Sequence, residues 1–135
     1  MKAQSILFHI ARLLAAVIML QTLFFKFSAS AESVYIFSTI GMEPWGRIGV
    51  GVAELIAAVL LVITRWSWLG ALLGIGLMAG AVGMHLTLLG IEIMGDGGYL
   101  FALALLVLVC SAGVLHLQRT HVQEFIQMLR SKVNV

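Results

Sequence analysis

The sequence predicts an all-α integral membrane protein: a four-helix bundle with a short interfacial helix in its first loop and an amphipathic C-terminal helix. Hydrophobic residues make up 61% of the 135 residues and charged residues 10%, with a mean hydropathy of +1.09. Soluble domains are far more polar than this. Four separate apolar runs are each long enough for the roughly 20 residues that cross a bilayer.

The apolar runs predict spanning helices over residues 5–25, 45–63, 68–89 and 99–116, within a single membrane domain of residues 1–135. The first loop has apolar residues at helical spacings and then the stop signals Gly41 and Pro44, so we expect a short interfacial helix there. The connection Thr64–Ser67 is so short that it predicts an antiparallel helix hairpin.

The tail, residues 117–133, is predicted to be an amphipathic helix lying on the membrane surface. Its apolar face consists of Val122, Phe125, Ile126, Leu129 and Val133. The alternative is a solvated terminal helix that frays.

Loop charges predict the orientation, because cytoplasmic loops of membrane proteins are enriched in Lys and Arg. With four spans, one side carries Lys2, Arg65, Arg119, Arg130 and Lys132, and the other carries Lys26 and Arg47 beside Glu32, Glu43, Glu92 and Asp96. Both termini are therefore expected in the cytoplasm. The net charge of +2 and the scattered basic residues argue against nucleic acid as a partner, which leaves the lipid bilayer.

Four ionisable residues interrupt or border the apolar runs: Arg12, Lys26, Glu54 and His85. A charge at the bilayer centre costs roughly 2.5–3.5 kcal/mol on insertion scales, so a partner or ligand is expected. At 1.5 Å per residue, Glu54 lies about 10 Å and His85 about 6 Å below the outer surface. With Lys26 at the outer end of the first helix, these three are predicted to converge. Arg12 lies deeper, and its long side chain is expected to reach toward Glu54.

Each of these residues also has an ordinary structural explanation. Lys26 would anchor a helix end, His85 would be a hydrogen-bonded structural histidine, and Glu54 with Arg12 would be a buried pair that fixes helix register.

Two faces of the third helix contain small residues, one with Gly74 and Ala81 and the other with Gly76, Gly80 and Gly83. Small residues let membrane helices approach closely, so we expect packing within and between subunits, that is, a homo-oligomer. The alternative is that membrane helices are simply rich in glycine.

Several chemistries find no support in the sequence. Cys110 is the single cysteine, which excludes an intrachain disulfide. One glutamate and one buried histidine fall short of a three-ligand metal site, so no metal is expected. No nucleophile–base–acid set is evident, and a non-catalytic subunit or binding protein is therefore favoured over a stand-alone enzyme.

In the order of its motifs, the chain resembles the DoxX-like family of small four-helix membrane proteins. The resemblance covers about residues 10–115 and includes Arg12, Phe25-Lys26-Phe27, the segment ending Ile40-Gly41-Met42-Glu43-Pro44, Gly51-Val52-Ala53-Glu54-Leu55 and Met78–His85. Some members of that family are small subunits of thiosulfate:quinone oxidoreductase, and others associate with redox or detoxification partners. The resemblance implies that Lys26, Glu54 and His85 occupy recurrent polar positions.

The leading hypothesis is a bacterial inner-membrane accessory or redox-linked subunit that works with a redox partner protein or membrane complex. Its outer-leaflet pocket would hold a quinone or similar small amphiphile, with Glu54 and His85 bonding the carbonyl oxygens and Lys26 supplying positive charge. Arg12 would hold Glu54 ionised. The alternatives are a small proton-coupled exporter that uses Glu54 and a non-catalytic scaffold of a membrane complex.

Overall fold

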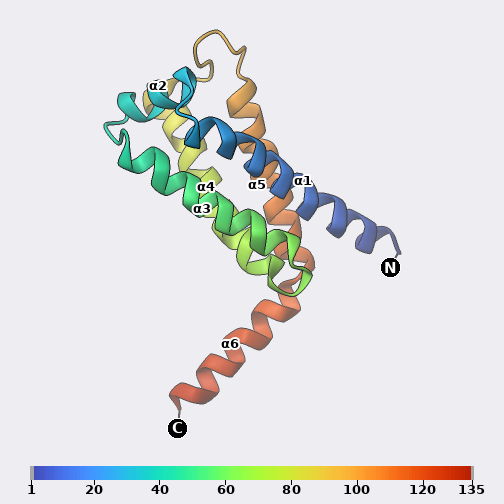
Figure 1. The fold of residues 1–135 in the computed structure, drawn as a ribbon. Helices are drawn as coiled ribbons and strands as arrows, with labels where there is room; N and C mark the ends of the chain where they lie inside the picture. The colour runs from blue at the N-terminus through green and yellow to red at the C-terminus, as the bar shows by residue number, and fades with distance from the viewer. Residues whose placement is uncertain (1, 135) are drawn as a thin grey trace.

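Every helix expected from the sequence is present in the computed structural model, which describes residues 2–134 (Figure 1). These residues contain no strand. The helical segments are α1 (Lys2–Phe27), α2 (Ala31–Thr39), α3 (Trp45–Val62), the 3₁₀ turn η1 (Thr64–Trp66), α4 (Ser67–Met84), the π turn η2 (His85–Leu89), α5 (Tyr99–Leu117) and α6 (Arg119–Val133).

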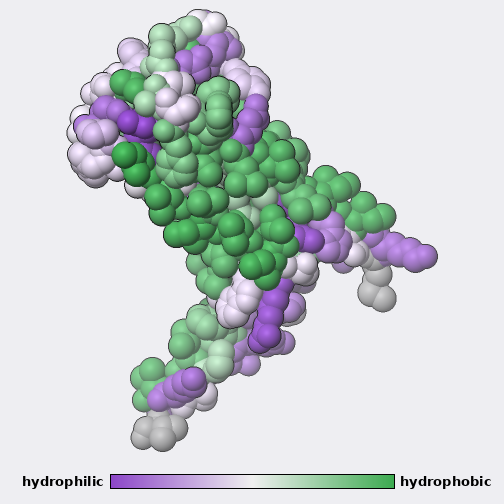
Figure 2. Space-filling model, in the orientation of Figure 1, coloured by the Kyte–Doolittle hydropathy of each residue, from purple (hydrophilic) through white to green (hydrophobic). Residues whose placement is uncertain are grey.

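Four segments are long and apolar enough to cross a membrane: Lys2–Phe27, Trp45–Val62, Thr64–Leu89 and Tyr99–Leu117. They pack as a ring in which α1 contacts α3 and α5, and α4 contacts the same two helices. Outside the ring, large apolar side chains are exposed on all four helices and form a continuous belt on the face shown in Figure 2. This belt is suited to contact with lipid, and the prediction of a four-helix membrane bundle is confirmed.

The centre of the bundle contains many small side chains. Ala15, Ala57, Ala58 and Ala71 are essentially inaccessible, and Met19 fills space among them. Since lipid tails are as apolar as the helices, close packing between small residues is what holds membrane helices together.

Glycines of α4 allow two close helix approaches. A Cβ at Gly70 would lie 2.7 Å from the Ala57 carbonyl oxygen of α3, and a Cβ at Gly74 would lie 2.9 Å from the Ser111 hydroxyl oxygen of α5. In contrast, a Cβ at Gly76 or Gly80 would meet open space. One of the two small-residue faces therefore packs inside the bundle and the other faces outward.

A polar tie joins the α3–α4 turn to the α5–α6 junction. The Ser67 hydroxyl donates to Gln118 Oε1 over 2.7 Å, and Gln118 Nε2 donates to the Thr64 carbonyl over 3.0 Å. Gln118 is 6% exposed, so its amide is satisfied almost entirely by these bonds. No pattern in the sequence singles out Gln118.

The two peripheral helices also form where expected. α2 begins after Ser30, whose hydroxyl accepts a hydrogen bond from the Ser33 N–H, and it buries Phe37. α6 extends away from the bundle (Figure 1), and the Phe125 ring packs 5.2 Å from the Trp68 ring. Ile126 and Leu129 on its apolar face are exposed. Their contact with a membrane surface stays a prediction.

We expect Gly70→Ala to destabilise the bundle by about 1–3 kcal/mol, the usual cost of overpacking. The added methyl group would meet backbone atoms of α3, which cannot move aside as a flexible side chain would. Gly76→Ala is the matched control because its methyl group enters open space. Thermal unfolding in detergent measures both, and equal midpoints for the two variants would contradict the close α3–α4 approach.

Candidate functional site

A buried ion pair joins the end of α1 to the middle of α3. Lys26 Nζ lies 3.0 Å from Glu54 Oε2, and the exposed fractions of the two side chains are 16% and 4%. Lys26 is in the last turn of α1, where the partial negative charge of the helix terminus also favours a cation. The predicted proximity of Lys26 and Glu54 is confirmed.

The Glu54 carboxylate has acceptor capacity beyond its ion pair with Lys26. Lys26 is within ion-pair distance of Oε2, but no donor meets hydrogen-bond geometry at this buried oxygen. An ionised carboxylate has about four lone-pair sites. A buried polar atom without a hydrogen bond is uncommon and calls for an explanation. One explanation is that a ligand donates the missing hydrogen bond to the Glu54 carboxylate.

Arg47 fixes the same end of the bundle from α3. Its guanidinium pairs with Glu43, with Nη2 2.8 Å from Oε1 and Nε donating to both carboxylate oxygens over 2.9 and 3.0 Å. Nη1 donates to the Lys26 carbonyl oxygen. In the sequence, Arg47 counts only toward the charges on one side of the membrane, although its i,i+4 spacing from Glu43 is a usable signal for the pair.

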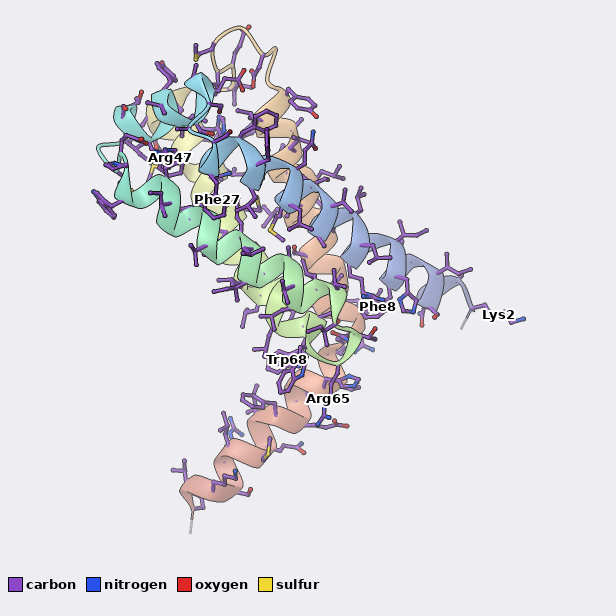
Figure 3. All side chains as sticks on the ribbon, viewed as in Figure 1. Lys2, Phe8, Phe27, Arg47, Arg65 and Trp68 are labelled. Atoms are coloured by element: carbon purple, nitrogen blue, oxygen red, sulfur yellow. The ribbon has the colours of Figure 1, made fainter. Side chains whose placement is uncertain are left out.

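Tight packing supports the ion pair from one side. The Phe27 ring lies against Gly51, where an added Cβ would be 2.7 Å from Phe27 Cε1. Figure 3 shows Phe27 and Arg47 on the facing helices α1 and α3 at this end of the bundle. The backbone that carries Lys26 is therefore held by both a hydrogen bond and a packing contact.

His85 is buried at 5% exposure and holds the loop between α4 and α5. Its Nδ1 lies 2.8 Å from the Gly90 carbonyl oxygen, and its ring packs 5.5 Å from the ring of Phe101. A carbonyl oxygen only accepts, so Nδ1 carries a proton. No hydrogen bond or ion pair within residues 2–134 joins His85 to Lys26 or Glu54, and its place in a shared site stays a prediction.

Asp96 organises the same loop. Its carboxylate accepts hydrogen bonds from the backbone N–H groups of Ile93 (2.9 Å), Gly98 (2.8 Å) and Leu100 (3.1 Å). Desolvation raises the pKa of Asp96, but these three bonds and nearby His85 outweigh it, so the pKa lies below its ordinary value. Stability from this carboxylate is therefore present above its unfolded-state pKa and is lost as pH falls through the lower folded-state pKa.

Arg12 does not reach Glu54, and that expectation was wrong. Its Nη1 donates to the carbonyl oxygens of Leu61 (3.0 Å) and Val62 (2.7 Å), and its Nε donates to His9 Nδ1 over 3.0 Å. The physical reason is that the last turn of a helix leaves carbonyl groups without intrahelical partners. The end of α3 offers such carbonyls to the buried guanidinium, at the opposite end of the bundle from Lys26.

Potential metal ligands are dispersed. Within the part of the chain that the structure describes, no three His, Cys, Asp or Glu side chains lie close enough to hold a metal ion together. Cys110 is a free, half-buried thiol on α5.

A family model for DoxX matches residues 7–88. The match covers more than half of the 135 residues. The chain belongs to the DoxX family. In comparisons with curated proteins and with solved structures, nothing matches the chain. The region shared with DoxX includes Arg12, Lys26, Glu54 and His85, so both ends of the α1–α3 contact lie within it.

For this DoxX protein we expect the variants Lys26→Met and Glu54→Gln each to lower thermal stability, because each leaves a partly or fully buried charge without its partner. The double variant removes both charges and should lose less stability than the two single variants summed. The coupling free energy should be roughly 0.5–3 kcal/mol, the range for residues in contact.

The control cycle combines Lys26→Met with Glu32→Gln, a change at an exposed carboxylate at the start of α2. That cycle should be additive. Additive effects in the Lys26–Glu54 cycle would show that the pair does not interact in the folded protein.

Proposed function

We propose that this DoxX-family protein is a redox-linked accessory subunit of a bacterial inner membrane, and that the Lys26–Glu54 pair binds the head group of a quinone or similar small amphiphile. The observation that carries the proposal is the Glu54 carboxylate, which is 4% exposed on its side chain and has unused acceptor capacity at Oε2. Family membership supports a membrane role but does not itself name a ligand.

The two charges match the two redox forms of a quinone. A quinone carbonyl is an acceptor, and the Lys26 ammonium has three N–H donors, with its nitrogen 3.0 Å from Glu54 Oε2. A quinol hydroxyl is a donor, and the carboxylate can accept from it. Hydrogen bonds to charged groups are worth about 1.5–3 kcal/mol each, so two such bonds suffice to orient a head group whose apolar tail lies along the lipid-facing belt.

A head group would approach from the Lys26 side, where 16% of the side chain is exposed. The Phe27 ring, packed against Gly51, would block approach between these two residues. Arg47 holds the Lys26 backbone in place before the ligand arrives, which lowers the ordering cost of binding. His85 would support the site by holding the adjacent loop, and Arg12 takes no part in it. Electron transfer would be carried out by a partner subunit.

We also propose that both termini are cytoplasmic. The N-terminal end of α1, the η1 turn and the start of α6 share one end of the bundle, whereas α2 and the loop of residues 90–98 share the other (Figure 1). Arg65, Arg119 and Arg130 lie toward the first end, and Lys and Arg are enriched on the cytoplasmic side of membrane proteins. The Lys26–Glu54 pair then lies in the outer half of the membrane.

The orientation can be tested in a Cys110→Ser background with the single additions Glu92→Cys and Ser131→Cys, both at exposed positions. A membrane-impermeant maleimide should label the first in intact cells and the second after membrane disruption alone. The reverse pattern would invert the proposed topology.

Binding of decylubiquinone to the purified full-length protein tests the ligand. Glu54→Gln should weaken binding of the reduced form at least about tenfold, because the charged acceptor is lost. Glu32→Gln is the matched control, with the same chemical change at an exposed carboxylate, and its affinity should equal that of the original protein. Variants are compared at a temperature where thermal unfolding shows each to be folded.

Equal affinity for Glu54→Gln and the original protein would overturn the proposal. Transport driven by a pH gradient in proteoliposomes, abolished by Glu54→Gln, would favour the exporter. Loss of a defined co-purifying partner in Glu54→Gln, with no quinone bound by either protein, would favour the scaffold.

A further inference from the structure

An open cleft lies at the end of the bundle opposite to Lys26 and Glu54. It has a volume of about 630 Å³ and is bordered by the first turns of α1, the η1 turn and the α5–α6 junction. Figure 3 places Phe8 and Arg65 at this end, where α1 and α6 diverge. The lining residues are Gln4, Ser5, Phe8, His9, Thr64, Arg65, Leu117, Gln118 and His121.

One wall of the cleft is held rigidly. Gln118 is buried, and both ends of its side-chain amide are engaged by the α3–α4 turn, through Ser67 and Thr64. Two segments far apart in sequence therefore keep a fixed separation.

The α1 wall presents a defined donor. Arg12 Nε donates to His9 Nδ1 over 3.0 Å, so Nδ1 acts as the acceptor and the imidazole proton resides on Nε2. His9 lines the cleft and offers this N–H. Behind it, the Arg12 guanidinium is 8% exposed, anchored on the Leu61 and Val62 carbonyls, and adds a fixed positive charge.

Two further donor groups are exposed at the cleft. Arg65 and His121 line the cleft and are exposed, and the Arg65 guanidinium lies 5.7 Å from the centre of the Trp66 ring. The nine lining residues, all within the described chain, include no Asp or Glu. The cleft lining thus combines several N–H donors with the positive charge of Arg65, and Phe8 and Leu117 form its apolar part.

We propose that this cleft is a binding site for a phosphate-bearing anion, with Arg65, His9 and His121 as the groups that contact the phosphate oxygens. Guanidinium groups match the geometry of phosphate well. Basic pockets at the interface end of membrane helices are suited to lipid head groups, and the apolar part would contact the glycerol and upper acyl region of such a lipid. A free phosphate shares the chemistry of the head group. The site is independent of the proposed quinone site.

The test uses the full-length protein in neutral detergent. Native mass spectrometry compares retention of phosphatidylglycerol with that of phosphatidylcholine of the same acyl chains, and calorimetry measures inorganic phosphate. We expect preferential retention of phosphatidylglycerol and an affinity about fivefold lower in Arg65→Gln, as expected for the loss of one basic group near a head group. The control is Arg130→Gln, an exposed arginine in the last turn of α6, which should leave the affinity unchanged.

The two arms separate the sources of the anion. An Arg65-dependent preference for phosphatidylglycerol identifies a lipid, and Arg65-dependent binding of inorganic phosphate without that preference identifies a soluble ligand. Equal losses in Arg65→Gln and Arg130→Gln would indicate unspecific surface attraction and overturn the proposal. Absence of both preferential lipid retention and phosphate binding would overturn it as well.

Discussion

Charged side chains join α1 to α3 at both ends of the contact between these helices. The positions of the Lys26–Glu54 pair and of the cleft at the opposite end depend on these bonds. At one end Arg12 of α1 donates to the last carbonyls of α3. At the other end Arg47 of α3 donates to the last-turn carbonyl of Lys26, which itself pairs with Glu54. Each charge is partnered across the helix pair, as it must be where water is scarce. The register between α1 and α3 is therefore set by directional bonds.

The contact between α4 and α5 is of another kind. It is the close approach of Gly74 to Ser111, together with apolar packing of Met78 and Val107. Dispersion contacts of this type are individually small and collectively large. On that side, the hydrogen bond of the buried His85 goes to the Gly90 carbonyl of the loop and not to a helix in the ring. The α1–α3 pair is thus held by charged side chains, whereas the α4–α5 pair is held by close packing.

Much of the fold could be predicted from sequence because a spanning helix needs a long apolar run, which is visible without knowledge of packing. The Lys26–Glu54 pair could be predicted because depth follows from position along each helix. The partner of Arg12 was predicted wrongly because backbone carbonyls at the end of α3 accept its hydrogen bonds as well as a carboxylate would, and a search for charged partners does not find them. The π turn at His85 and the Gln118 tie could not be predicted, since both depend on contacts between segments distant in sequence.

The lengths of the helices have a consequence for the surrounding lipid. α3 has 18 residues and α1 has 26, so at 1.5 Å per residue α3 is about 27 Å long and α1 about 39 Å. A bilayer has a hydrocarbon thickness of about 30 Å. On the α3 side, this hydrophobic mismatch must be met by local thinning of the lipid or by flanking polar side chains that extend to the membrane surface. The membrane surface is therefore displaced toward the last turn of α3, whose carbonyl oxygens accept hydrogen bonds from Arg12.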